Sequence, residues 1–400
     1  MVKKVTRKLI LFIAFFLITL SNSSYFIKTG INDLIEYAGM FILLSCISVC
    51  FLGEGKIRKK FGMAGRTFFC IVFFCIGICF QGLDIKVRLR LIISMMILAF
   101  LACMSESMIR SFSQIRSASI GIFCGCMAAG LIGIFTGASF FTIAETGLVK
   151  YGFNCGMEHK NYFAYAMIAS FIGIFLHGKL EEWKKGDWVF LVLESVLLLS
   201  ANTRGAWIVF AAFIMIANVD FVNKKIPEKK RTIFWGTIVV TATVVAMWFF
   251  IKYALNSETY MYRVRGILNY IQMYSRDMFH LIFGNAEMAF RDSGMDYNKN
   301  IRSVVGWDGA TDIAWLNIMI KNGILGILAY IFIFLRMFAL SIKSHNTKYK
   351  IASFSVLLSF LLTSLVEPFI ANVHWAYSPF CYCVLGGLCG LIYDEISRKK

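Results

Sequence analysis

A series of long apolar runs constrains this chain more than any other feature of its sequence. Most runs approach the roughly 20 residues that cross a bilayer as an α-helix, and backbone groups in lipid are satisfied within such a helix. The candidate spans are residues 9–27, 34–52, 67–83, 91–104, 117–137, 161–177, 188–201, 205–219, 233–254, 311–335, 353–370 and 380–393. We therefore expect an all-α integral membrane protein, a polytopic bundle of about 12 transmembrane helices that forms one domain over residues 1–400.

The composition agrees with a membrane protein and argues against a nucleic-acid partner. The chain is 58% hydrophobic and 16% charged, whereas soluble domains average 45–50% apolar and about 25% charged residues. The net charge of +18 comes from lysines and arginines clustered between the apolar runs. Clusters in such places anchor helices to anionic lipid headgroups. We expect membrane lipids as partners and no nucleic acid.

The basic clusters alternate along the chain and predict its orientation. Positive loops stay in the cytoplasm, which places both termini inside. The opening MVKKVTRK leads into an apolar run with no small-residue cleavage site, so we expect the first segment to be a retained span. Two segments violate the rule by falling outside. One is the short loop DIKVRLR, which makes Arg88 a candidate substrate-binding residue, and the other is residues 256–310.

Residues 256–310 form the large external loop expected between the ninth and tenth spans. The segment is polar and cationic, and an anionic lipid-linked substrate would account for that charge. Arg263 and Arg265 open it in YMYRVRG, and in a helix they would diverge by about 200 degrees, so that one faces a site. The polar–apolar rhythm that follows predicts a partly helical loop on the membrane surface.

Three further residues at predicted helix starts are candidates for catalysis. His159 precedes the sixth span, where the helix dipole favours the neutral imidazole that a general base needs. Arg204, in SANTRGAW, offers a planar fork for a phosphate, or it is an anchor that snorkels to the interface. Asp312 begins the tenth span, where it caps the helix or pairs with an arginine.

The eleventh span and the turn after it supply candidate substrate-binding residues. Glu367 precedes Pro368, which should break the helix and open polar backbone to an outer cavity. His374 and Trp375 follow in the next external turn, and an aromatic beside polar groups suits a sugar. Trp375 also fits the aromatic belt of the membrane interface.

The twelve cysteines and the remaining polar residues indicate no metal or redox chemistry. Nearly all of the cysteines lie in apolar runs without a CxxC pair, which is typical of small packing residues rather than a disulfide framework. Metal-ligand spacings and phosphate-binding glycine loops are missing from the sequence. We expect neither a metal nor a cofactor.

Four motifs together resemble those of the bacterial O-antigen polymerase and O-antigen ligase superfamily. EHKNYFAYAM is similar to its His-x-Asn-x-x-Ala motif, and LLLSANTRGAWIVFA to its Arg-Gly signature between two spans. YRVRGILNYIQMYSRDMFHLIFGNA resembles the start of the family's external loop. TDIAWLNIMIKNGILGILAYI resembles its exit, with Gly323, Ile324 and Gly326 in place. The order of the motifs and the number of spans agree over the whole chain.

The resemblance implies metal-independent glycosyl transfer at the outer face of the bacterial cytoplasmic membrane. The donor would be an oligosaccharide on a polyprenyl diphosphate and the acceptor a glycan, with chain-length regulators and flippases as protein partners. Arg204 and either Arg263 or Arg265 would clamp the diphosphate, with His159 lining the site. Ligases usually carry a histidine at the position of Asp312. Either Asp312 or His159 is then the base, or Asp312 orients an arginine.

Three functions follow from these observations. The departure at Asp312 favours a polymerase of lipid-linked repeat units over a ligase that transfers a finished glycan. A transporter or flippase of lipid-linked oligosaccharide is the third. Transporters carry paired halves and charges deep in their spans. This sequence has no internal repeat and gathers its charges near the outer edge, which favours an enzyme.

Overall fold

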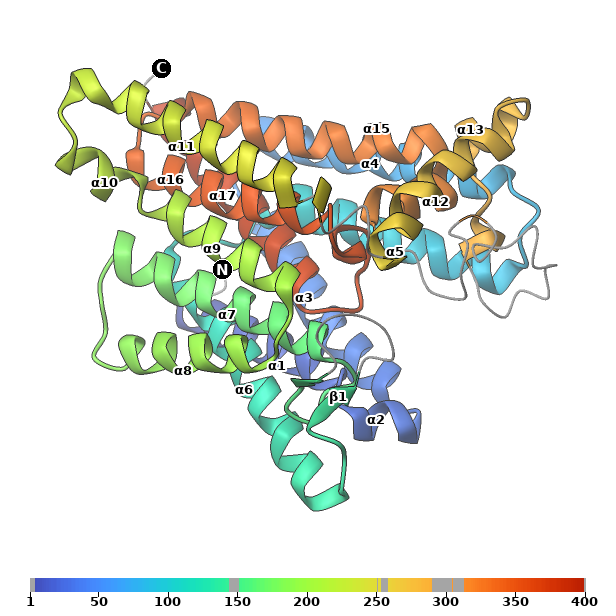
Figure 1. Ribbon diagram of the computed structural model, residues 1–400, viewed down its shortest axis with the longest axis horizontal. Helices are drawn as coiled ribbons and strands as arrows, with labels where there is room; N and C mark the ends of the chain where they lie inside the picture. The colour runs from blue at the N-terminus through green and yellow to red at the C-terminus, as the bar shows by residue number, and fades with distance from the viewer. Residues whose placement is uncertain are drawn as a thin grey trace.

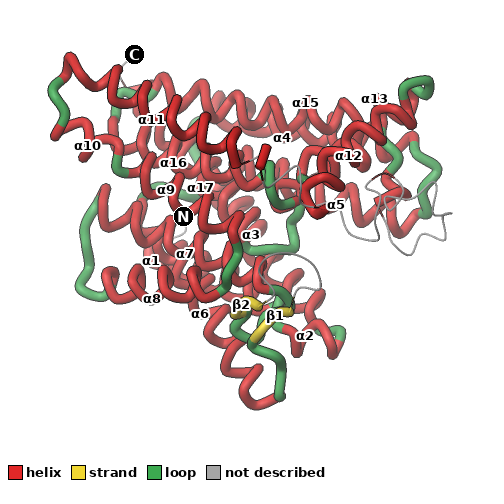
Figure 2. Tube along the Cα trace, in the orientation of Figure 1, coloured by secondary structure: helices red, strands yellow, loops and turns green. Residues whose placement is uncertain are grey.

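The computed structural model describes the chain except residues 1–3, 144–150, 250, 253–257, 290–303, 305–312 and 399–400, and for residues 4–5, 239, 242–243, 245–246, 249 and 258–264 it describes the backbone alone. Helices dominate (Figures 1 and 2). They are α1 (Lys4–Leu20), α2 (Ser24–Thr29), α3 (Asn32–Gly53), α4 (Ile57–Phe80), α5 (Ile85–Met104), α6 (Phe112–Thr136), α7 (Lys160–Leu180), α8 (Asp187–Ser200), α9 (Arg204–Ala217), α10 (Val219–Lys225), α11 (Glu228–Phe249), α12 (Glu258–Tyr274), α13 (Met278–Phe283), α15 (Ala314–Lys343), α16 (Thr347–Thr363) and α17 (Tyr377–Arg398). Short 3-10 turns are η1 (Ser105–Ser107), η3 (Ala286–Ala289) and η5 (Pro368–Ala371).

The fold is that of a multi-pass helical membrane protein. Within the described residues, seven helices are long and apolar enough to cross a bilayer, or eight if α9 and α10, bent by 51°, form one span. The expected count of about 12 also includes shorter helices such as α1, α8 and α16, and it stays a prediction. Helix α1 packs between α3 and α6, α7 packs on α6, and α15 lies along α4 (Figure 1).

Two basic clusters that were predicted to lie in loops are instead part of helices. Helix α4 begins at Ile57, ten residues before the predicted span 67–83, so its cationic first turn is helical. The expected loop DIKVRLR is wrong, because α5 begins at Ile85 and includes Arg88. Asp84 explains the change, since its side chain accepts a hydrogen bond from the Lys86 amide at 2.8 Å and so caps the helix.

A two-stranded hairpin interrupts the otherwise helical chain between α6 and α7. Strands β1 (Phe141–Ile143) and β2 (Tyr151–Phe153) pair antiparallel, with Phe141 opposite Phe153 (Figure 2). The all-α prediction did not include this hairpin. The hairpin lies against the α8–α9 turn, where Asn202 Nδ2 donates a hydrogen bond to the Tyr151 carbonyl at 3.1 Å.

The described part of residues 256–310 is helical and is docked on the bundle. Helices α12 and α13 confirm that the amphipathic stretch is helical, and they lie at the opposite end from the C-terminus (Figure 1). Gly323 interrupts α15 with φ 61° and ψ −157°. A Cβ there would lie 2.3 Å from the Ile282 carbonyl oxygen, so the close approach of the two segments requires glycine.

Gln81 joins this docked segment to the end of α4. Its Nε2 donates to the carbonyls of Phe283 at 2.8 Å and Lys321 at 3.0 Å. Its Oε1 accepts from the Ala286 amide at 2.6 Å. A buried amide that makes three hydrogen bonds fixes the position of the backbone around it.

Candidate functional site

The site begins at the start of α7, which His159 caps. His159 has an extended backbone, and its Nδ1 accepts a hydrogen bond from the Asn161 amide at 3.1 Å. A ring nitrogen that accepts carries no proton, so the neutral imidazole holds its proton on Nε2. Nε2 is then a hydrogen-bond donor to whatever lies beside it.

Asn161 connects three segments that are distant in sequence. Its Nδ2 donates to Glu367 Oε1 at 2.9 Å, and its Oδ1 accepts from the Thr203 hydroxyl at 3.3 Å. Helix α16 ends at Thr363 and Pro368 starts the 3-10 turn η5, which confirms that the helix breaks before the proline. Glu367 is extended at that break, and its carboxylate meets the start of α7.

Two cationic side chains occupy the first positions of two neighbouring helices. Lys160 opens α7 and is 7% exposed, while Arg204 opens α9 and is exposed. They are close enough for their charges to interact. A cation at the positive end of a helix dipole is unfavourable by about 0.3–1 kcal/mol. Among the described residues, no carboxylate lies within ion-pair distance of Arg204. Two helix N-termini and two cations therefore lie at one corner, together with the Glu367 carboxylate that Asn161 binds.

The hairpin and the α8–α9 turn hold this corner together. Asn202 adopts φ 53°, a left-handed conformation that asparagine tolerates, and this places Thr203 and Arg204 at the start of α9. On β2, a Cβ at Gly152 would lie 2.2 Å from the Ala201 carbonyl oxygen and 2.4 Å from Lys160 Cδ. Glycine therefore permits the strand to touch both the turn and the lysine.

Aromatic side chains form the neighbouring wall. The rings of Tyr162 and Trp375 are 4.5 Å apart and inclined by 31°, and Phe369 meets Trp375 edge to face at 4.5 Å. The His159 ring lies 5.7 Å from Tyr162. A cavity of about 10 Å³ lies among Tyr162, Trp375 and Asn22, which is enough for a single water. Trp375 and Tyr162 thus stand beside the polar corner, as the sugar-binding prediction requires.

His374 and Arg88 make structural contacts elsewhere. His374 Nδ1 lies 2.7 Å from Oε1 of the buried Glu36 on α3, and its carbonyl accepts from Asn22 at 3.1 Å. Arg88 donates to the carbonyls of Gln81 at 2.8 Å and Leu83 at 3.3 Å, so it holds the loop that positions Gln81. That either residue also binds substrate stays a prediction.

The structure therefore brings together His159, Arg204, Glu367 and Trp375. Arg265 lies exposed on α12, whereas Asp312 and the side chain of Arg263 lie outside the described residues.

Sequence reasoning missed three neighbours of these residues, namely Lys160, Asn161 and Thr203. All three lie in the motifs EHKN and SANTRG. Their position next to the predicted site residues His159 and Arg204 is the sequence feature that could have identified them.

No group of three His, Cys, Asp or Glu side chains is arranged for a metal in the described ranges. Neither a protein-family model nor a curated protein matches this chain in sequence comparison.

Proposed function

We propose that the chain is a glycosyltransferase that polymerises oligosaccharide repeat units carried on polyprenyl diphosphate. One observation carries the proposal. Lys160 and Arg204 sit at two helix N-termini, while Asn161, next to Lys160, binds the Glu367 carboxylate and Tyr162 packs against the Trp375 ring. A diphosphate needs the positive corner, a sugar suits the aromatic wall, and a hydroxyl acceptor needs a base.

The membrane placement follows from the expected topology. With 12 spans and both termini in the cytoplasm, the start of α7 and the start of α9 lie at the outer face of the bacterial cytoplasmic membrane. The polyprenyl chain then remains in lipid while its diphosphate reaches Arg204 at the interface. Helices α12 and α13 lie in the external segment, and Arg265 is exposed on α12.

The chemistry is a displacement at the anomeric carbon of the donor sugar. The acceptor hydroxyl attacks the anomeric carbon. The bond between that carbon and the diphosphate oxygen breaks, and its electron pair leaves with polyprenyl diphosphate. Arg204 and Lys160 stabilise the charge that grows on the leaving oxygen, and Nε2–H of His159 donates to it. Glu367, held by Asn161 through Oε1, takes the proton of the acceptor hydroxyl.

The test is reconstitution with a polyprenyl-diphosphate oligosaccharide in liposomes that contain a chelator. We expect release of polyprenyl diphosphate and a ladder of products that differ by one repeat unit. A single capped acceptor would instead indicate a ligase. Movement of the intact lipid-linked sugar across the bilayer without release would indicate a transporter. Full activity of Arg204→Ala would contradict the clamp, with Arg58→Ala at the far end of the bundle as the matched control.

A further inference from the structure

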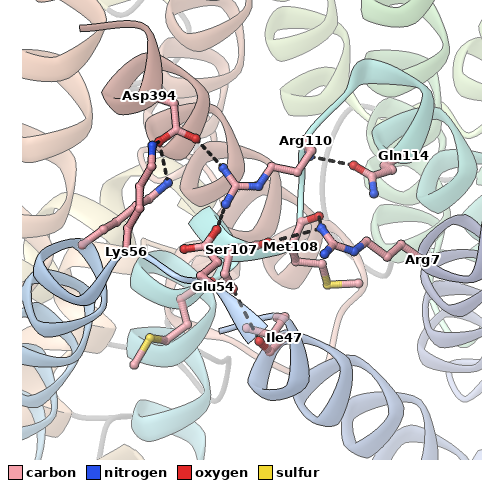
Figure 3. Close-up of polar contacts among 11 residues, drawn as sticks. Arg7, Ile47, Glu54, Lys56, Ser107, Met108, Arg110, Gln114 and Asp394 are labelled. Atoms are coloured by element: carbon pink, nitrogen blue, oxygen red, sulfur yellow. Dashed lines mark hydrogen bonds and ion pairs between the residues drawn. The ribbon is translucent and has the colours of Figure 1, made fainter. Parts of the chain in front are cut away.

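A second polar cavity lies at the end of the bundle that carries both termini. Its volume is about 340 Å³, within the range of about 300–1,000 Å³ that is usual for small-molecule sites. We call it the basic-end cavity and define it by the six charged side chains that line it, which are Arg7, Glu54, Lys56, Lys59, Arg110 and Asp394 (Figure 3). They come from α1, the α3–α4 loop, α4, the turn before α6, and α17.

The two carboxylates of the cavity are already engaged. Asp394 lies 3.1 Å from Lys59 Nζ, 3.6 Å from Lys56 Nζ and 2.7 Å from Arg110 NH1 (Figure 3). Glu54 pairs with the other terminal nitrogen of Arg110. Four cations against two carboxylates leave two positive charges in excess.

Arg7 carries much of that excess. Its NH1 donates to the backbone carbonyls of Ser107 at 3.4 Å and Met108 at 3.3 Å, which are neutral acceptors (Figure 3). Arg7 also acts on its neighbour. Burial lowers the pKa of Arg110, Asp394 opposes that change, and the like charge of Arg7 lowers the pKa further. The cavity therefore has a positive potential that its own carboxylates do not cancel.

The surroundings of the cavity place it where a membrane meets water. Val49, on the apolar side of its lining, is 52% exposed on α3, as lipid-facing residues are. At the other side, the Lys56 side chain is 63% exposed at the mouth. Gly53 and Gly55 leave this mouth open, because a Cβ at either would meet nothing within 4 Å.

We propose that the basic-end cavity binds a phosphate-bearing anion, supplied either by a lipid headgroup or by a soluble phosphate compound. Arginine and lysine form short, charge-assisted hydrogen bonds with phosphate oxygens, and basic pockets between transmembrane helices hold anionic headgroups. The site is separate from the glycosyl-transfer corner, and the proposal does not depend on that function.

The experiment uses the full chain purified in neutral detergent, with two binding arms. Native mass spectrometry measures retention of phosphatidylglycerol against phosphatidylcholine, and calorimetric titration measures binding of inorganic pyrophosphate at low salt. We expect Arg7→Gln to weaken binding at least tenfold in the arm that is positive for wild type. Arg58→Gln is the matched control, because Arg58 carries the same charge as Arg7 and lies next to Lys59 in the first turn of α4 but does not line the cavity.

Each outcome decides the proposal. Selective retention of phosphatidylglycerol alone identifies a lipid headgroup, and pyrophosphate binding alone identifies a soluble ligand. If Arg7→Gln does not fold, Lys56→Gln tests the same prediction through an exposed side chain at the mouth of the cavity. The proposal is overturned if wild type binds in neither arm, or if Arg58→Gln loses as much binding as the cavity variants.

Discussion

The Nδ1 atom of His159 accepts a hydrogen bond from the Asn161 backbone amide at 3.1 Å, so one nitrogen of this imidazole serves as a helix cap. That bond determines what the other nitrogen can do. The neutral ring keeps its proton on Nε2 and can donate to an oxygen, but it cannot accept a proton there. This geometry favours a donor role for His159 and transfers the general-base role to a carboxylate.

We therefore predict different results for two substitutions at this position. His159→Asn retains a capping side chain, whereas His159→Ala removes it at a cost of about 0.5–2 kcal/mol. If Nε2–H stabilises the leaving oxygen, both variants lose activity roughly 100-fold or more, while His159→Asn keeps wild-type thermal stability. Turnover and melting temperature are measured on the same samples. If His159→Asn keeps wild-type turnover, His159 is only a helix cap.

Glu367 is predicted to act as the base. Glu367→Gln keeps the oxygen that accepts from Asn161 at 2.9 Å but removes the charge. Loss of a general base lowers the rate by about 10²–10⁴-fold, so we expect a decrease of that size in turnover with little change in substrate affinity. Asp33→Asn, on the exposed first turn of α3, is the matched control. Near-normal turnover in Glu367→Gln would leave Asp312 as the candidate.

The helical architecture was predictable because membrane spans depend on a one-dimensional signal. Twenty apolar residues must form a helix in lipid, whichever neighbours they have. The ends were harder to predict. Helix α5 begins among basic residues because Asp84 caps it. Pro368 predicted the break after α16, but the helix ends at Thr363, earlier than the expected end of the span at residue 370. The hairpin β1–β2 is held by tertiary contacts such as that of Asn202 with Tyr151.

The site was only partly predictable, because its geometry depends on contacts between distant segments. His159, Arg204, Glu367 and Trp375 were chosen as polar or aromatic residues at predicted helix ends. Asn161 contacts His159, Thr203 and Glu367, and its hydrogen bond to Glu367 spans 206 positions of sequence. Nothing in the local pattern indicates such a pairing. The same limit explains Arg88, whose charge suggested a ligand but whose guanidinium holds the backbone near Gln81.

Gly323 is predicted to be essential for docking the external segment. Its φ of 61° and ψ of −157° suit glycine almost exclusively, and strain in this region costs about 1–3 kcal/mol for other residues. Gly323→Ala would add a clash with the Ile282 carbonyl. We expect a lower melting temperature and faster tryptic cleavage after the exposed Arg276. Gly65→Ala, where a Cβ meets nothing within 4 Å, should be neutral or stabilising by about 0.5–1 kcal/mol.

An ion triad around a buried carboxylate is predicted to stabilise the end of the bundle that carries both termini. Glu106 is 1% exposed and pairs with Arg66 at 2.8 Å and with Arg336. Glu106→Gln leaves the half-buried guanidinium groups of Arg66 and Arg336 without a carboxylate, and breaking such a pair costs up to about 3–5 kcal/mol. Denaturant or thermal unfolding should show a loss of this size. Glu106→Gln combined with Arg66→Met and Arg336→Met should recover much of it, and no recovery would contradict the pairing.

Cys155 gives a test of both burial and orientation. Burial raises the pKa of its thiol from 9.0 to about 11, so about a hundredfold less thiolate exists near neutral pH than for a free thiol. In a variant that keeps Cys155 and lacks the other cysteines, we expect an impermeant maleimide to react slowly at pH 7.5 and faster as the pH rises towards 11. Ser139→Cys in a cysteine-free background, exposed in the same loop, should react quickly on intact cells. Labelling of Ser139→Cys only after lysis would place the His159 corner on the cytoplasmic side and contradict the proposed topology.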